Sequence, residues 1–241
     1  MSQADFVYPG KELEAFAHAV NWKRYFAALL RPYVTGAVLE VGAGLGGTTS
    51  TLWNPTVRRW VCVEPDPRLA GRLAGTLSGH EPRPEVVVGD IDRVPRAAEF
   101  DCIVYIDVLE HIRADAAQLE SAASRLRPGG HLVVLSPAFP ILFSAFDAAL
   151  GHERRYTRRT LSRVMPRELE RIELYYADSV GMLLSLGNRV LLRQGMPSDR
   201  QILFWDRRVI PVSRIVDRIV RRSFGRSIIA VYRRSMSRPS Q

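Results

Sequence analysis

The sequence is poor in several residue types, and each shortage excludes a class of protein. Its 241 residues include two cysteines, Cys62 and Cys102, and both lie within apolar runs. This pattern excludes a disulfide framework and a cysteine metal cluster, so we expect a reducing compartment. No run of 18 apolar residues occurs, so no membrane span is predicted. The first residues lack an apolar signal core, and we expect a cytoplasmic location.

Lysine is nearly absent, since Lys11 and Lys23 are the only two, and arginine supplies the other positive charges. Residues 1–150 hold 14 Lys/Arg and 17 Asp/Glu, a balance of −3, whereas residues 151–241 hold 20 and 8, a balance of +12. Such a split is typical of proteins with an anionic partner, such as nucleic acid, lipid or a phosphorylated substrate. A solvated basic face in an arginine-rich protein explains it equally well, so composition leaves both interpretations open.

Short apolar runs alternate with helical periodicity after residue 36. Strands are predicted at 37–41, 60–63, 85–88, 101–106 and 131–135. Helices are predicted at 11–31, 48–53, 67–77 and 114–126, and a Pro-Gly-Gly turn at 128–130. This alternation predicts an α/β fold with a Rossmann-like, doubly wound parallel sheet.

The chain after residue 137 is less regular. A short helix is predicted at 160–164, and strands at 168–177 and 227–232. About 48 residues separate these two strands and show helical patterning, as in a lid over a site. One apolar stripe there lies opposite four arginines and comprises Val212, Ile215, Val216, Ile219 and Val220. We expect this stripe to pack on the core or on a neighbouring subunit; a membrane-surface helix is the alternative.

The residues that end the strands are where ligands bind in such sheets. A glycine-rich loop containing Gly42, Gly44 and Gly46 follows the first strand and allows close approach of a ligand to the backbone. Glu64 ends the second strand, where a carboxylate can accept from both hydroxyls of a ribose. Asp107 ends the fourth strand, beside the place for an ammonium or sulfonium group. Alone, the glycine loop fits NAD, FAD or S-adenosylmethionine.

Five segments in order narrow this choice. They read VLEVGAGLGGTT (38–49), VCVEPD (61–66), GDID (89–92), FDCIVYIDVLEHI (100–112) and LRPGGHLVVLSP (126–137). Together they resemble the successive motifs of the class I S-adenosylmethionine-dependent methyltransferases. That family's fold implies seven strands, mostly parallel with an antiparallel last strand, and a helical insertion before that strand.

A further block, from Asp147 to Tyr156, has the pattern D-x-x-x-G-H-x-R-R-Y. It resembles a block of the small-molecule, ubiquinone-methyltransferase-like branch. The segment around Trp22 and Tyr25 resembles the entry helix that closes over the cofactor. The resemblance therefore implies one domain with a helical cap (1–34), a cofactor-binding core (35–137) and a substrate side (138–241).

The resemblance also implies roles for single residues. S-adenosylmethionine would be the cofactor and S-adenosylhomocysteine the product. Glu40, Gly42 and Gly44 would line the methionine half. Glu64 and Pro65 would hold the ribose, and Asp90 and Ile91 the adenine. Asp107 and Val108 would lie at the methionine end, with Trp22 and Tyr25 above.

Methyl transfer from a sulfonium needs a positioned and deprotonated acceptor. His152 is the candidate base because histidine titrates near neutral pH. Its alternative role is a structural hydrogen bond that holds the lid. The other candidates on the acceptor side are Asp147, Tyr156, Tyr105 and His111. Tyr105 and His111 also fit structural roles.

Arg154 and Arg155 are expected to accept an anionic group of the substrate, unless they form an exposed helix face. No metal site is implied, and whether a carboxylate pair binds a divalent ion that assists the reaction is left open. The substrate is expected to be a small molecule, such as an anionic, lipid-like or secondary metabolite methylated on O or N. Contact with a membrane surface or carrier protein is left open, as is the oligomeric state.

Three other functions stay open. The basic C-terminal part fits a nucleic-acid methyltransferase. Against this, the fourth strand continues as Ile106-Asp107-Val108-Leu109 and not as an N-P-P-Y segment. A non-catalytic partner subunit would also bind the cofactor, although the intact 147–156 block opposes that interpretation. A related enzyme that uses the cofactor for other chemistry is the third alternative.

Overall fold

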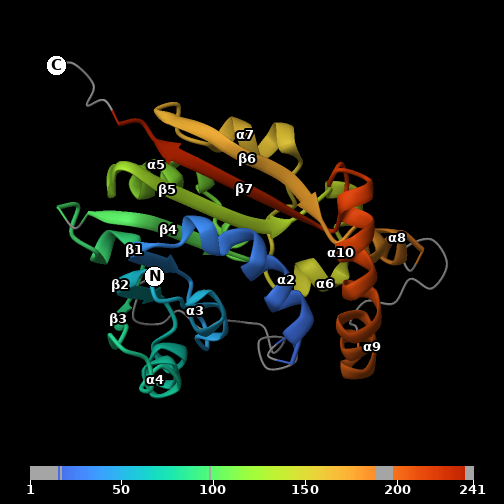
Figure 1. The fold of residues 1–241 in the computed structure, drawn as a ribbon, viewed down its shortest axis with the longest axis horizontal. Helices are drawn as coiled ribbons and strands as arrows, with labels where there is room; N and C mark the ends of the chain where they lie inside the picture. The colour runs from blue at the N-terminus through green and yellow to red at the C-terminus, as the bar shows by residue number, and fades with distance from the viewer. Residues whose placement is uncertain (1–15, 17, 98, 188–197, 237–241) are drawn as a thin grey trace.

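The computed structural model describes residues 16, 18–97, 99–187 and 198–236, in which seven strands form one sheet (Figure 1). The strand order is β3-β2-β1-β4-β5-β7-β6. Their bounds are β1 Gly36–Val41, β2 Val57–Glu64, β3 Glu85–Val88, β4 Phe100–Ile106, β5 Leu126–Pro137, β6 Leu169–Ala177 and β7 Ser227–Arg234. Strands β1 to β5 pair in parallel, whereas β7 is antiparallel to both β5 and β6. The predicted fold class is therefore confirmed.

Helices and short turns connect these strands. The α-helices are α2 Val20–Leu30, α3 Gly47–Leu52, α4 Pro67–Thr76, α5 Asp115–Ser124, α6 Ala145–Ala149, α7 Arg158–Val164, α8 Ser179–Gly187, α9 Asp199–Phe204 and α10 Ile210–Ile219. The 3-10 turns are η2 Arg31–Tyr33, η3 Ile91–Arg93, η4 Leu109–His111 and η5 Pro140–Leu142, and one π-helical turn, η7, spans Trp205–Val209. Of the helix predicted at 11–31, residues 11–15 and 17 lie outside the described residues.

Alternate side chains of the strands form two cores on opposite faces of the sheet. On one face, Leu39 of β1 packs in the same cluster as Leu119 of α5 and Leu161 of α7. On the other face, Val38 packs in a cluster with Phe26 of α2 and Ile210 of α10. Strands buried on both faces need continuous apolar runs, which is why the sequence pattern located them.

Strand β5 differs from the prediction. The Pro128–Gly130 segment was expected to be a turn before a strand at 131–135, but β5 begins at Leu126. Leu126 pairs with Phe100 of β4, and the register then shifts before Cys102 pairs with His131. Gly129 takes a φ of +80°, so the strand passes this irregularity without ending.

The apolar stripe of α10 also differs from the expected packing on the core. Ile215 and Ile219 are 64% and 74% exposed, whereas Ser213 and Asp217 are fully buried. The buried face is polar because its groups find partners inside: Asp217 Oδ2 accepts from the Tyr25 hydroxyl at 2.7 Å. Among the described residues, no helix is long and apolar enough to cross a membrane.

Candidate active site

The loop between β1 and α3 opens the site at the carboxyl end of the sheet. Gly42 and Gly46 have φ values of +72° and +80°, which favour glycine. A Cβ on Gly42 would lie 2.6 Å from Val108 Cγ2, so this loop touches the segment after β4. The Gly44 amide donates to Glu64 Oε2 at 2.7 Å, which ties the loop to the end of β2.

Glu64 is buried beside that loop. Besides Gly44, the Asp66 amide donates to its other carboxylate oxygen, Oε1, at 2.9 Å. Burial raises the pKa of Glu64, and the two amide hydrogen bonds oppose that rise. Pro65 follows half-buried. The carboxylate is thus held in a fixed position where the first two βα loops meet.

Glu40 points into the core instead of toward this edge. Its Oε2 accepts from the Thr49 hydroxyl at 2.6 Å and from Trp60 Nε1 at 3.0 Å. Burial raises its pKa to about 7. This geometry makes Glu40 a positioning residue for α3 through Oε2, and its place beside the methionine half stays a prediction.

The end of β3 supplies Asp90 and Ile91. The Gly89 amide donates to the Glu64 carbonyl, so this end lies directly beside that of β2. Asp90 is half-buried and accepts from the Asp92 amide at 3.1 Å. Ile91 is 1% exposed and packs in the core, so little of its side chain faces a ligand.

Asp107 ends β4 in a left-handed conformation, with a φ of +53°. Its amide donates to the Leu135 carbonyl of β5. The side chain is exposed on one side. Desolvation by the surrounding protein raises its pKa to about 6, and electrostatic interactions with His152 and Arg226 act to lower it. A strained acidic residue among positive groups is typical of functional sites.

A buried hydrogen-bond network holds His152 beside Asp107. Asp147 Oδ1 lies 2.9 Å from His152 Nδ1 and accepts from Arg155 Nε at 2.8 Å. Asp147 Oδ2 accepts from Arg155 Nη2 and from the Ser144 amide. Burial acts to raise the pKa of Asp147, but these hydrogen bonds hold it well below its usual value. Because an ionised carboxylate only accepts, Nδ1 of His152 donates to Asp147, and Nε2 is directed away from that carboxylate.

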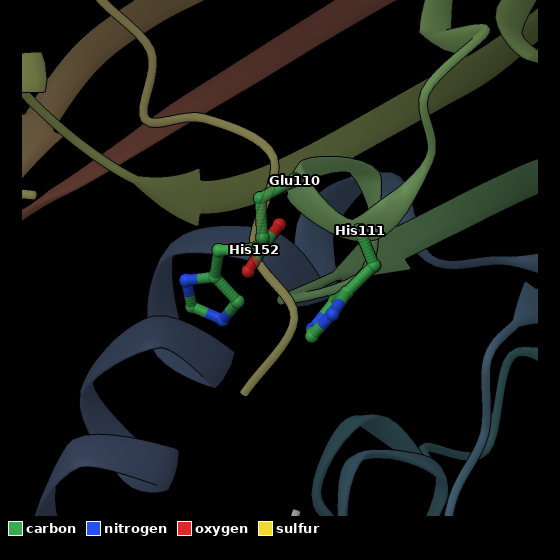
Figure 2. Close-up of side chains that lie close together, drawn as sticks. All are labelled: Glu110, His111 and His152. Atoms are coloured by element: carbon green, nitrogen blue, oxygen red, sulfur yellow. The ribbon is translucent and has the colours of Figure 1, made fainter. Parts of the chain in front are cut away.

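His111 and Glu110 lie next to His152 (Figure 2). The rings of His111 and His152 are perpendicular, with centroids 4.6 Å apart. Burial lowers the pKa of His111 to about 4, and electrostatic interaction with His152 is the second, smaller cause. Glu110 is fully buried, and its Oε2 accepts from the Ser136 hydroxyl at 2.5 Å.

Three residues expected to touch the substrate are used inside the protein. Tyr156 is 1% exposed, and its hydroxyl donates to Asp115 at 2.7 Å. Tyr105 is fully buried, and its hydroxyl accepts from Gln118. Arg154 pairs with the same Asp115. Tyr105 and Tyr156 are thus too buried to face a substrate, whereas Arg154 pairs with Asp115 but keeps 30% of its side chain exposed.

Arg155, Asp147 and the two entry-helix residues also bind partners within the protein. Arg155 donates both a side-chain Nε and an Nη2 bond to Asp147, so its guanidinium orients the network. Trp22 and Tyr25 of α2 are buried where this helix packs against the 199–219 segment. There the Trp22 amide donates to Asp206. These residues join the cap to the insertion and present little surface to a cofactor.

Sequence reasoning missed several residues of this region. Glu110 lies within the FDCIVYIDVLEHI motif, so its position was marked, but nothing in a single sequence showed that it is buried. Asp178, Asp206 and Asp217 were also missed. They accept hydrogen bonds from backbone or side-chain donors of α2, α8 and α10 across long sequence separations. Such contacts carry no local pattern.

A sequence model of a family described as a methyltransferase domain matches residues 15–184. The chain belongs to this methyltransferase family. Its fold agrees: the N-methyltransferase NodS from Bradyrhizobium japonicum WM9, solved with S-adenosylhomocysteine, has a TM-score of 0.55 at 19% identity, covering 95% of this chain and 99% of NodS. The resemblance to class I S-adenosylmethionine-dependent methyltransferases is thus confirmed.

Two other similar proteins differ in substrate. The mitomycin 7-O-methyltransferase MmcR has a TM-score of 0.59 at 14% identity, covering 92% of this chain and 54% of MmcR. The ribosomal RNA small subunit methyltransferase A of Thermobifida fusca (strain YX) is 48% identical over 61 residues, 24% of this chain. The match spans only 21% of that protein. These likenesses support the methyltransferase fold and leave the substrate to other arguments.

Proposed function

We propose that this methyltransferase transfers the methyl group of S-adenosylmethionine to an oxygen or nitrogen of a small molecule. The observation that carries the proposal is the orientation of His152. Its Nδ1 is held by the buried Asp147, so Nε2 is directed away from that carboxylate, and the ring lies close enough to Asp107, at the end of β4, to act on its charge. A neutral imidazole oriented by a carboxylate is suited to accept a proton.

The cofactor is proposed to lie across the carboxyl ends of β1, β2 and β4. Glu64, with Pro65 beside it, faces the ribose hydroxyls, and Gly42 and Gly44 allow close approach of the methionine half. Asp107 and Val108 lie at the sulfonium end, and Asp90 and Ile91 flank the adenine. S-adenosylmethionine brings an already activated methyl group, so the protein supplies position and the base.

The remaining side chains support this arrangement indirectly. Asp147 and Arg155 orient His152, and Tyr156 with Arg154 anchors the same segment to Asp115. We assign all four to positioning the acceptor side. His111 lies in ring contact with His152 and is the nearest candidate for substrate contact.

The substrate class is inferred from the exposed surface of the insertion before β7. Exposed apolar side chains of α9 and α10, Phe204, Ile215 and Ile219, are interspersed with the exposed Arg207 and Arg218. An apolar surface with arginines suits an anionic, lipid-like metabolite, presented by a membrane surface or a carrier protein. A cytoplasmic enzyme of secondary metabolism would fit these features.

Ligand-induced stabilisation tests the cofactor assignment. At about 100 times its Kd, a ligand adds roughly 2.7 kcal/mol to the free energy of unfolding. S-adenosylhomocysteine should therefore raise the Tm by about 5–10 °C, and NAD should leave it unchanged. A shift with NAD alone would contradict the cofactor assignment.

A variant tests the role of His152. With radiolabelled S-adenosylmethionine and a panel of phenolic, carboxylic and amine acceptors, His152→Asn should lower kcat by about 100- to 10,000-fold. Its Tm shift with S-adenosylhomocysteine should persist. His131→Asn is the matched control, since His131 lies on β5 against Tyr33. Equal activity of the His152 variant and the control would refute the proposed base.

A further inference from the structure

We propose that Glu110, His111 and His152 form a binding site for one divalent transition-metal cation, such as Zn²⁺. Each side chain offers one ligand atom, and the three atoms all lie within 4.8 Å of one another. Figure 2 shows the three side chains gathered where η4 meets the segment before Tyr156. Two imidazoles with one carboxylate are a known donor set for zinc with an open coordination position.

The backbone brings the ligands together. Glu110 and His111 lie on η4, directly after β4, whereas His152 follows α6. The Glu153 amide donates to the Glu110 carbonyl at 2.8 Å, which fixes His152 next to this turn. A tetrahedral zinc site places neighbouring ligand atoms about 3.4 Å apart. The ligand atoms, now within 4.8 Å of one another, would have to move closer together for a cation to be bound by all three.

Glu110 gives the independent evidence for a cation. Glu110 is fully buried, and the Ser136 hydroxyl donates a hydrogen bond to one of its carboxyl oxygens, Oε2. The other oxygen, Oε1, is buried and has no hydrogen-bond partner. A buried carboxyl oxygen without a partner lowers the stability of the fold, and most buried polar atoms in folded proteins do have a partner. A cation beside His111 and His152 would supply that partner.

His152 is also oriented as a metal ligand. Asp147 accepts from its Nδ1 and itself receives hydrogen bonds from Arg155 and Ser144, so it can only accept. The lone pair of Nε2 is therefore directed away from Asp147. A carboxylate that fixes the ring in this way is the usual support of a zinc-bound histidine.

The position of the cation suggests what it would do. Its open coordination position would lie beside Asp107, at the proposed methyl-transfer end. A cation there can bind an acceptor hydroxyl and stabilise its deprotonated form. This consequence rests on the proposed methyl transfer but replaces His152 as the base, because a metal-bound Nε2 accepts no proton and the acceptor proton would pass to water; cation binding itself does not depend on methyl transfer.

Cobalt titration tests the site. The full-length protein, without a histidine tag and stripped with EDTA, should bind one equivalent of Co²⁺ and develop visible d–d absorption, which Zn²⁺ then abolishes. His111→Asn and His152→Asn should each weaken Co²⁺ binding at least about 100-fold, and Asp147→Asn about 10- to 100-fold. His131→Asn, which removes a histidine outside the cluster, should bind like the unaltered protein.

The outcomes separate the two proposals, because the titration contains no cofactor. Retention of the Tm shift with S-adenosylhomocysteine shows that each variant is folded, and Glu110→Gln repeats the test without altering a histidine. No Co²⁺ binding, or full binding by both histidine variants, would overturn the cation site and leave the methyltransferase standing. Co²⁺ binding without S-adenosylhomocysteine binding would support the cation site and contradict the proposed cofactor. Loss of methyl transfer after EDTA, restored by Zn²⁺, would place the cation in the reaction.

Discussion

At the scale of single residues, the buried carboxyl of Glu40 makes stability depend on pH. Its pKa is raised to about 7 by burial, from 4.5 for an unperturbed glutamate, with Glu64 and Cys62 as neighbours. A carboxyl that is easier to protonate in the folded state stabilises the fold most at low pH. That contribution is complete below pH 4.5 and is lost as the pH rises through 7.

We therefore expect the unaltered protein to lose about 2 kcal/mol of unfolding free energy between pH 5.5 and 8 through Glu40 alone. Glu40→Gln keeps an oxygen for Thr49 and Trp60 but does not titrate, so this part of the pH dependence should disappear. Urea unfolding of both proteins at the two pH values measures the difference. Because Glu64 and Asp107 also have raised pKa values, only the difference between the two proteins is informative. Parallel pH profiles would contradict the assignment.

How far the sequence predicted the site also depends on single residues. It placed Glu64 and Asp107 correctly at the ends of strands, since parallel strands end at one edge of the sheet. It did not distinguish side chains that face a ligand from those that face the core. Tyr105 and Tyr156 show this limit, because a buried tyrosine with a partner and a substrate-binding tyrosine look alike in a sequence.

At the scale of elements, the apolar runs of the strands predicted the sheet well, whereas the helical pattern of the insertion predicted its packing less well. The stripe of α10 was expected to pack on the core or on a neighbouring subunit, but within the chain the polar face of α10 is buried instead. The reason is specific pairing: Asp217 accepts from Tyr25 and from the Asp178 and Ser179 amides. Partners that lie 39 or 192 residues away in the sequence leave no local pattern from which the pairing could be predicted.

Asp217 consequently gives a prediction about the insertion. Asp217→Ala leaves three donors without an acceptor, and should lower the free energy of unfolding by about 3 kcal/mol. Tyr25→Phe removes only one donor and should cost about 1 kcal/mol. Glu168→Gln, at an exposed residue, should change it by less than about 0.5 kcal/mol. Urea unfolding of the three variants decides the order; equal losses for Asp217→Ala and Glu168→Gln would be inconsistent with this pairing.

At the scale of the whole molecule, the uneven charge bears on the nucleic-acid alternative. The net charge of +9, concentrated after residue 150, should produce weak binding to any RNA. We expect the affinity for a small-subunit ribosomal RNA transcript to fall steeply between 50 and 200 mM salt, and to be the same for an unrelated RNA of equal length. Filter binding measures both. Incorporation of labelled methyl groups into the ribosomal transcript alone would favour the nucleic-acid alternative.

The place of β7 between β5 and β6 has a consequence for synthesis. Strand β6 pairs with β7, and β7 begins some fifty residues after β6 ends. At about 5–20 residues per second, a ribosome needs several seconds for that stretch. During this delay β5 and β6 both offer unpaired edges to other chains. The nascent protein is thus most vulnerable to aggregation just before its last strand emerges, and a stop codon within that strand should yield insoluble product, not a shortened enzyme.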